Sequence, residues 1–317
     1  MAAHGRNAAL PLDFRALGKK LCNWDRWGNN DRIGTLNFIT PERLVAASRE
    51  IRTGKLFDLG IPVNLQGIQL GVVRTNPVHL MSITPLDLKG RDDGLFVADD
   101  YIFMPLQSVT QWDGLGHVGY DGFLYNNVPA DSITTMGGST VLSIDQIAVK
   151  GIAGRGVLLD LAMLKGVDML GAEEVIMPED LDAAEVRQRV RVGPGDIVII
   201  RTGWIRNFVV DHSPTAYWKG NPGLHYTCAE WLYDRQVAAT ASDNWMVEFA
   251  PANMEDLTLP FHSIVIRDMG MTLGEIFDLE ALAKDCAADG VWSFFFTAPP
   301  LKVTGGVGAA ITPLAIK

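Results

Sequence analysis

The chain has 317 residues, of which 48% are apolar and 20% charged, a composition typical of a globular protein with a substantial core. The formal net charge of −10 argues against a nucleic-acid or anionic-membrane partner, because neither attracts an acidic surface. Three cysteines without a CxxC pair disfavour thiolate zinc and dithiol redox chemistry. The absence of a signal-like or membrane-spanning apolar run predicts a cytoplasmic protein.

The first third of the chain combines helical and strand patterns. An N-terminal extension (about residues 1–55) contains a helix start, with Thr40 as the N-cap and Pro41 at the first helical position. Short apolar runs interrupted by Gly and Pro then predict strands within residues 56–106. His79 lies in one of these runs, and we expect it to be buried in the core or to line a pocket.

The second half of the chain alternates predicted strands and helices. Strand patterns occupy residues 156–161, 195–204, 237–241 and 291–296, and helix patterns occupy residues 178–186, 229–235 and 280–288. No internal repeat, low-complexity tract or linker divides the chain. We therefore expect a single domain of α/β or α+β type over residues 1–317.

A short polar stretch, Thr110-Gln111-Trp112-Asp113-Gly114-Leu115-Gly116-His117, is the strongest candidate for a functional site. It places an acid and an imidazole four residues apart with glycines between them, so the backbone can bend around a small ion or substrate. We expect a loop that follows a strand, and such loops often carry chemistry. A turn in which Asp113 caps its own loop and His117 bonds a carbonyl is an equally good interpretation.

Two residues far along the chain extend this candidate site. Asp113, His117, His262 and Glu275 together offer the oxygen and nitrogen donors that zinc and manganese accept. Such an ion polarises a carbonyl and lowers the pKa of bound water, while a neighbouring imidazole transfers protons. The spacing alone brings none of the later residues near Asp113, so separate structural roles are the alternative. The sequence contains no GxSxG elbow and no P-loop, which disfavours a serine hydrolase and a nucleotide-phosphate site.

These residues resemble the cyclase superfamily of metal-dependent hydrolases, which includes bacterial kynurenine formamidase and isatin hydrolase. The family pattern HxGTHxDxPxH falls on residues 107–117, where Thr110, Asp113 and His117 match. The resemblance covers nearly the full length of the chain. It implies a swivelling β/β/α fold around a central sheet or barrel-like core, assembled as a homodimer or homotetramer.

The resemblance also implies a divalent metal ion, manganese or zinc, with His117 as the general acid/base. The residues at the implied ligand positions are Gln107, Gln111, Asp113, His262 and Glu275. Gln107 and Gln111 replace histidines of the family pattern, and an amide oxygen is a weaker donor than an imidazole for zinc. Either the glutamines bind through oxygen, which favours manganese or magnesium at one site, or the metal has been lost. The joint presence of Asp113, His117, His262 and Glu275 favours retained hydrolase chemistry.

The sequence therefore predicts a metal-dependent hydrolase that opens an amide, lactam or ester bond in a small cyclic or aromatic substrate. Metal-activated water attacks the carbonyl, and His117 transfers the proton. The aromatic side chains expected to wall the substrate pocket are Trp24, Trp27, Trp112, Tyr120 and Trp245. Two alternatives are a metal-free cyclase or lyase that uses Asp113 and His117 directly, and a non-catalytic protein that binds a small molecule.

Overall fold

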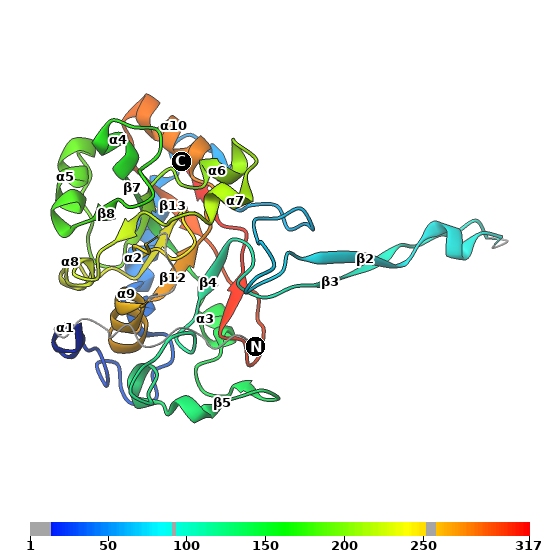
Figure 1. Cartoon of the computed structure of the whole chain (residues 1–317), viewed down its shortest axis with the longest axis horizontal. Helices are drawn as coiled ribbons and strands as arrows, with labels where there is room; N and C mark the ends of the chain where they lie inside the picture. Colours follow the sequence, from blue (N-terminus) through cyan, green and yellow to red (C-terminus); the bar gives the residue numbers. More distant parts are fainter. Residues whose placement is uncertain (1–13, 91–92, 252–257) are drawn as a thin grey trace.

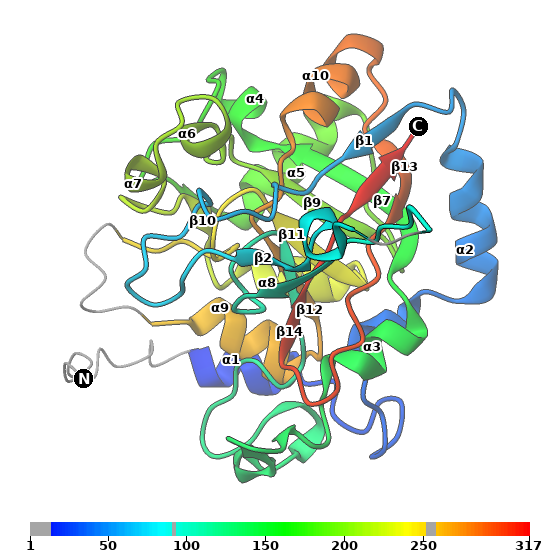
Figure 2. The same cartoon turned by 90° about the vertical axis from the view of Figure 1, so that its right-hand side faces the viewer.

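A curled nine-stranded sheet is the centre of the computed structural model, which describes residues 14–90, 93–251 and 258–317 (Figures 1 and 2). Its strands, in spatial order, are β1 (Leu56–Asp58), β15 (Leu314–Ile316), β13 (Ser293–Thr297), β7 (Ala153–Asp160), β9 (Ile197–Arg201), β11 (Ala239–Ser242), β12 (Thr272–Glu275), β4 (Gln111–Asp113) and β14 (Gly308–Ala310). The curl gives the sheet the shape of a half barrel. The predicted α/β class is thereby confirmed.

The middle of the sheet is parallel and buried on both faces. Strands β7, β9, β11 and β12 run parallel, whereas the outer strands pair antiparallel. Along β9, Ile197 and Ile199 point into one apolar cluster, and Val198 and Ile200 point into another. A strand covered on both faces reads as a continuous apolar run, which is why the sequence predicts this strand clearly.

Helices cover the two faces of the sheet. Helices α1, α5 and α8 contribute to the cluster on one face, and α3 and α10 contribute to the cluster on the other. The α-helices are α1 (Phe14–Lys20), α2 (Pro41–Ala47), α3 (Ile144–Lys150), α4 (Leu161–Lys165), α5 (Pro178–Gln188), α6 (Arg206–Val209), α7 (Pro214–Tyr217), α8 (Cys228–Asp234), α9 (Pro260–His262) and α10 (Glu280–Asp289). Within the described ranges, no helix is long and apolar enough to cross a membrane.

Short elements complete the fold. They are the 3-10 turns η1 (Gly34–Phe38), η2 (Ser48–Glu50), η3 (Pro85–Leu88), η4 (Tyr125–Asn127) and η5 (Ala130–Ser132), the π-helix η7 (Ser263–Asp268), and the two-residue strands β5 (Ile133–Thr134), β6 (Gly138–Ser139), β8 (Val175–Ile176) and β10 (Gly223–Leu224). The predicted start of α2 is confirmed, because the Thr40 side chain accepts a hydrogen bond from the Arg43 amide and Pro41 occupies the first turn.

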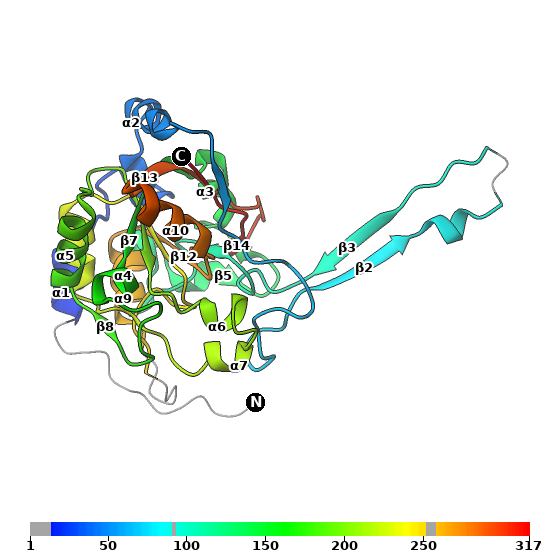
Figure 3. The same cartoon turned by 90° about the horizontal axis from the view of Figure 1, so that it is seen from above.

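A long hairpin projects away from the body of the molecule (Figures 1 and 3). Its strands β2 (Val78–Ile83) and β3 (Asp99–Phe103) pair with one another in a separate two-stranded sheet. His79 was predicted to lie in the core or to line a pocket. The prediction is wrong, because its side chain is 52% exposed on the hairpin and lies 2.7 Å from the Asp100 carboxylate. An apolar run on a projecting hairpin has the same sequence pattern as a run in the core.

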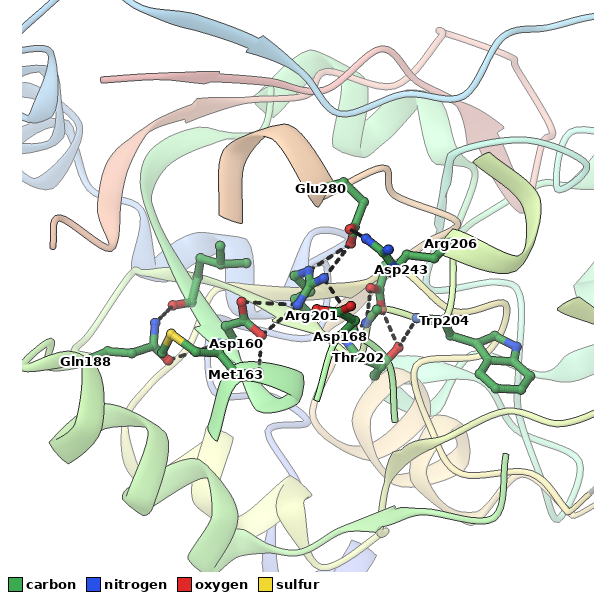
Figure 4. Close-up of polar contacts among 12 residues, drawn as sticks. Asp160, Met163, Asp168, Gln188, Arg201, Thr202, Trp204, Arg206, Asp243 and Glu280 are labelled. Atoms are coloured by element: carbon green, nitrogen blue, oxygen red, sulfur yellow. Dashed lines mark hydrogen bonds and ion pairs between the residues drawn. The ribbon is translucent and has the colours of Figure 1, made fainter. Parts of the chain in front are cut away.

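An ion-pair network joins the carboxyl ends of the parallel strands (Figure 4). The Arg201 guanidinium, at the end of β9, donates to both carboxylate oxygens of Asp160 at 3.0 and 3.2 Å and to Glu280 at 2.8 Å. It also donates to the Asp168 carbonyl at 3.0 Å, while Arg206 donates to the second Glu280 oxygen at 2.6 Å. The network therefore links β7, β9 and the start of α10.

A second set of hydrogen bonds continues this network toward the candidate site. The buried Asp243 carboxylate accepts hydrogen bonds from the Thr202 amide at 2.9 Å, the Thr202 hydroxyl at 2.6 Å and the Gly203 amide at 2.7 Å (Figure 4). Burial nevertheless raises the pKa of Asp243 to about 6. These bonds fix the chain where β11 ends, immediately before Trp245.

Replacing Arg201 with Met is expected to destabilise the fold by about 3–5 kcal/mol, because Asp160 becomes a buried carboxylate without its guanidinium partner. Urea unfolding followed by circular dichroism measures this loss. Arg191→Met is the matched control, since Arg191 is 84% exposed and lies 3.6 Å from Glu185. The control should change the unfolding free energy by at most ~0.5 kcal/mol. Equal effects of the two substitutions would contradict a structural role for the network.

Candidate metal centre

Two neighbouring strands bring three polar side chains to one face of the sheet. Strand β4 pairs antiparallel with β12, and the register places Gln111 opposite Glu275 and Asp113 opposite Leu273. Because side chains alternate along a strand, Gln111 and Asp113 share a face and Trp112 points to the other. Asp113 therefore lies on a short buried strand, whereas the sequence predicted a loop.

His262 completes this cluster from a different part of the chain. It ends α9 directly before the π-helix η7, an element that often occurs at functional sites. Its Nε2 atom lies 3.3 Å from Glu275 Oε1 and 3.9 Å from Asp113 Oδ2. One donor atom from each of these three residues lies within 4.8 Å of the others. The fold thus joins residues that spacing alone left far apart.

The cluster contains buried oxygens that lack hydrogen-bond partners. Both carboxylate oxygens of Asp113 and Oε1 of Gln111 are buried and accept no hydrogen bond, and the nearest imidazole nitrogens lie 3.6 and 3.9 Å from the Asp113 oxygens. Burial and the negative charge of Glu275 raise the pKa of Asp113 to about 6. Burying a carboxylate without hydrogen bonds is costly, and a divalent cation would supply the missing partner. These residues fit a metal ion. The alternative in which Asp113 caps its own turn is wrong, because neither of its carboxylate oxygens accepts a hydrogen bond.

The two glutamines of the family pattern occupy different environments. Gln111 donates from Nε2 to Glu275 Oε2 at 2.6 Å, which leaves its Oε1 atom available. The side-chain amide of Gln107 lies beside Gly308 of β14. Among the described residues, no hydrogen bond joins the Gln107 side chain to the cluster. The structure therefore brings together Gln111, Asp113, His262 and Glu275, and places Gln107 at the adjacent strand.

Glu248 orients His262, and sequence reasoning missed it. Glu248 Oε1 contacts His262 Nδ1 and accepts a hydrogen bond from the His262 amide at 3.0 Å. Its Oε2 atom accepts one from the Phe261 amide, also at 3.0 Å. Burial opposes a charged imidazole, but Glu248 and Glu275 outweigh it and raise the pKa of His262 to about 10. In sequence, Glu248 belongs to no motif and merely follows the polar end of β11.

His117 lies at the mouth of the cluster. Its Nε2 atom is 3.6 Å from Asp113 Oδ1, and its side chain is 22% exposed. Burial lowers the pKa of His117, so the neutral imidazole predominates at neutral pH. Among the predicted site residues, His117, Trp245, His262 and Glu275 line one cavity of about 180 Å³. The remaining lining residues are Val73, Arg74, Trp218, Met246 and Leu259.

Two tryptophans form an aromatic wall of this cavity. The rings of Trp218 and Trp245 have centroids 4.7 Å apart, and Trp218 donates its indole N–H to the Ile68 carbonyl at 2.7 Å. Trp245 was predicted as a substrate-binding residue, whereas Trp218 was not. A tryptophan in a turn-rich segment gives no sequence signal for the pocket it faces.

The other four predicted aromatic residues lie outside the lining of this cavity. Trp112 is fully buried, packs edge-on against Phe277 and donates its indole N–H to the Ala298 carbonyl. The indole of Trp24 donates to the Arg267 carbonyl, Trp27 packs against Phe38, and the Tyr120 hydroxyl donates to Asp268. These contacts anchor core and N-terminal segments, which is the usual role of a buried ring with one polar atom.

The chain is similar to known cyclases over most of its length. A sequence model described as "Putative cyclase" matches residues 57–249. A crystal structure of a novel cyclase shares 39% identity and a TM-score of 0.86, over 93% of this chain and 99% of that one. The comparison with curated proteins found no match.

Two more distant structures share the fold. Isatin hydrolase A from Ralstonia solanacearum has 18% identity and a TM-score of 0.61, over 87% of this chain and 97% of that one. A predicted metal-dependent hydrolase from Bacillus stearothermophilus has 17% identity and a TM-score of 0.52, over 83% of this chain and 98% of that one.

Replacing Glu248 with Gln is expected to weaken Mn²⁺ binding roughly 10–100-fold, because the imidazole loses the carboxylate that orients it. Isothermal titration of the purified variant with Mn²⁺ measures the change. Glu179→Gln is the matched control, since Glu179 is an exposed residue of α5. Unchanged affinity in Glu248→Gln would show that His262 needs no such support.

Proposed function

The chain belongs to the cyclase family, and on that premise we propose that it is a metal-dependent hydrolase. The proposed reaction opens an amide, lactam or ester bond in a small cyclic or aromatic substrate. The observation that carries the proposal is that both buried Asp113 oxygens, beside Glu275 and His262, have no hydrogen-bond partner. A plain scaffold gives no reason to bury two carboxylates and an imidazole together.

The donor chemistry favours an oxygen-loving cation. Asp113, Glu275 and Gln111 offer oxygen, and His262 offers one nitrogen through Nε2. A ligand set rich in oxygen suits manganese or magnesium, whereas a set rich in histidine suits zinc. A divalent cation held there would polarise a carbonyl and lower the pKa of water toward neutrality. We therefore favour manganese as the resident ion.

His117 is the proposed general acid/base. Its imidazole lines the cavity and is neutral at neutral pH. Its Nε2 atom can therefore accept a proton from the water molecule that attacks the substrate carbonyl. The nearby Asp113 carboxylate, 3.6 Å away, stabilises the imidazolium that results. The same imidazole can then return the proton to the leaving group.

The cavity supports a small, flat substrate with a polar edge. Trp218 and Trp245 give apolar faces on which a ring can pack, and Arg74 supplies a guanidinium to the same lining. A guanidinium can bind a carbonyl or carboxylate oxygen of the substrate or product. Opening a cyclic amide or ester releases a carboxylate, which suits this mixture of ring surface and positive charge. The cavity volume of about 180 Å³ restricts the substrate to a small molecule.

Protein purified without chelator is expected to contain stoichiometric metal, and the Asp113→Asn variant is expected to lose it, because the amide removes a charged ligand. Inductively coupled plasma mass spectrometry measures the content. Asp131→Asn, at an exposed residue, is the matched control and should keep the metal. If the unaltered protein holds no metal and takes up neither Mn²⁺ nor Zn²⁺, the proposed hydrolase mechanism fails. Chemistry by Asp113 and His117 alone, or ligand binding without turnover, would then be the explanation.

Replacing His117 with Ala is expected to lower kcat by about 10²–10⁴-fold while Mn²⁺ affinity stays unchanged, because the imidazole transfers protons and is not a proposed ligand. A screen of lactams, lactones and aryl amides identifies the substrate for this assay. His212→Asn is the control, since His212 is exposed and Asn tolerates its positive φ of 52°. Full turnover in His117→Ala would remove His117 from the mechanism.

A further inference from the structure

Two strained residues stand beside acids of the candidate metal centre. Val247 directly precedes Glu248, and Ile276 directly follows Glu275. Both strained residues have a backbone φ of 60°. That left-handed conformation is an outlier for a β-branched side chain, and it persists only where surrounding contacts hold it. Each strained residue is therefore the chain neighbour of an acid that contacts the His262 imidazole.

One residue, Asn244, is hydrogen-bonded to both strained positions. Its side-chain Oδ1 atom accepts a hydrogen bond from the Val247 amide at 2.7 Å, and its backbone carbonyl accepts one from the Ile276 amide at 2.9 Å. The side-chain amide of Asn244 donates to the Pro222 carbonyl at 2.6 Å. Asn244 is fully buried, so removing its side chain would leave both of these backbone groups unpaired in the interior.

The strained turn at Val247 fixes where the Glu248 carboxylate points. On the far side of the turn, the Glu248 carbonyl accepts a hydrogen bond from the Asn221 side chain at 2.6 Å. A Cβ atom on Gly223 would lie 2.5 Å from the Glu248 carbonyl carbon, so β10 packs directly against this backbone. With the backbone held on both sides, the carboxylate reaches the amide and the imidazole of His262.

The direction of Glu248 decides which His262 nitrogen faces the other donors. A carboxylate only accepts hydrogen bonds, so the Nδ1 atom in contact with Glu248 carries a proton. The Nε2 atom, which lies 3.3 Å from Glu275 and 3.9 Å from Asp113, is therefore the one that remains to bind a cation. If Glu248 pointed elsewhere, the ring could rotate or change tautomer, and cation binding would weaken.

We propose that Asn244 is a positioning residue of the candidate metal centre. By holding Val247 in its strained conformation, Asn244 directs Glu248 onto Nδ1 of His262 and keeps Nε2 toward the two acids. Among the described residues, the side-chain hydrogen bonds of Asn244 go only to backbone atoms, so it acts through Glu248 and is not itself a ligand. The effect on a metal rests on the proposed function, whereas the contact between Glu248 and His262 does not.

Proton NMR of the metal-free protein tests that contact. An imidazole N–H bonded to a buried carboxylate gives a resonance far downfield, which the His262→Asn variant assigns by its loss. The resonance is expected in the unaltered protein and is expected to shift or disappear in Asn244→Ala. Asn207→Ala is the matched control, since Asn207 is also buried but donates to the Trp204 carbonyl in another segment. An unaltered protein without the resonance, or an unchanged resonance in Asn244→Ala, would overturn the proposal.

Mn²⁺ titration calorimetry measures the consequence for metal binding. Asn244→Ala is expected to weaken Mn²⁺ binding roughly 10-fold, as expected for a lost support of a ligand, whereas the Asn207→Ala control should change it by less than about twofold. Because Asn244 acts through Glu248, the same substitution in the Glu248→Gln background should add less than about a twofold loss. A merely structural role predicts equal losses in the two backgrounds, and that result would overturn the proposal.

Asn244→Asp keeps the proposal testable if Asn244→Ala does not fold. The aspartate has nearly the same shape and retains an oxygen that accepts from the Val247 amide. This variant is expected to keep the downfield resonance and to lose at most about threefold in Mn²⁺ affinity. Loss of the resonance in Asn244→Asp would overturn the proposal. An unaltered protein that shows the resonance but binds no Mn²⁺ would count against the hydrolase alone.

Discussion

The buried carboxylates of Asp113 and Glu275 impose an electrostatic constraint on the centre of this structure. The pairing of β4 with β12 holds them on one face of the sheet, where burial and the charge of Glu275 raise the pKa of Asp113. Side-chain hydrogen bonds fix that pairing: the Thr110 hydroxyl donates to the Ile276 carbonyl at 2.6 Å, and the Thr272 hydroxyl donates to the Asp113 carbonyl. A fold that fixes two acids so firmly in the interior needs a positive charge beside them. A divalent cation bound by both carboxylates and by the neutral His262 imidazole would supply that charge.

The glutamine at position 111 changes the type of donor atom in this cluster but still provides one potential metal ligand. A histidine there would add a nitrogen donor, whereas Gln111 donates a hydrogen bond to Glu275 and keeps a neutral oxygen free. The amide thus stabilises one acid of the cluster and leaves the charge of the ligand set unchanged. Because oxygen donors favour harder cations, the substitution bears on which metal is bound more than on whether one is bound. Gln107 lies beside Gly308, and among the described residues no hydrogen bond joins its side chain to the cluster.

The strength of the local signal decided which features the sequence could predict. The run at 195–204 predicted β9 because a strand buried on both faces has no polar alternation, and the Thr40–Pro41 cap predicted the start of α2. Asp113 and His117 stood out by their spacing, but His262 and Glu275 could be joined to them only through the resemblance to a family. Glu248 and Trp218 gave no signal, because their contacts arise from tertiary packing. His79 was assigned to the core because a projecting hairpin and a buried strand share one pattern.

The proposed metal ligands and the proposed substrate walls are supported by different parts of the fold. Gln111, Asp113 and Glu275 lie on strands of the central sheet, where the backbone has least freedom. Trp245 follows β11, and the hydrogen bonds of Asp243 hold the chain at that point. Trp218 donates its indole N–H to the Ile68 carbonyl, in the segment that leads to the β2–β3 hairpin. A change in the loop that carries Trp218 therefore alters the shape of the cavity while the sheet keeps Gln111, Asp113 and Glu275 in place. Substrate choice can diverge on such a scaffold without loss of the metal centre.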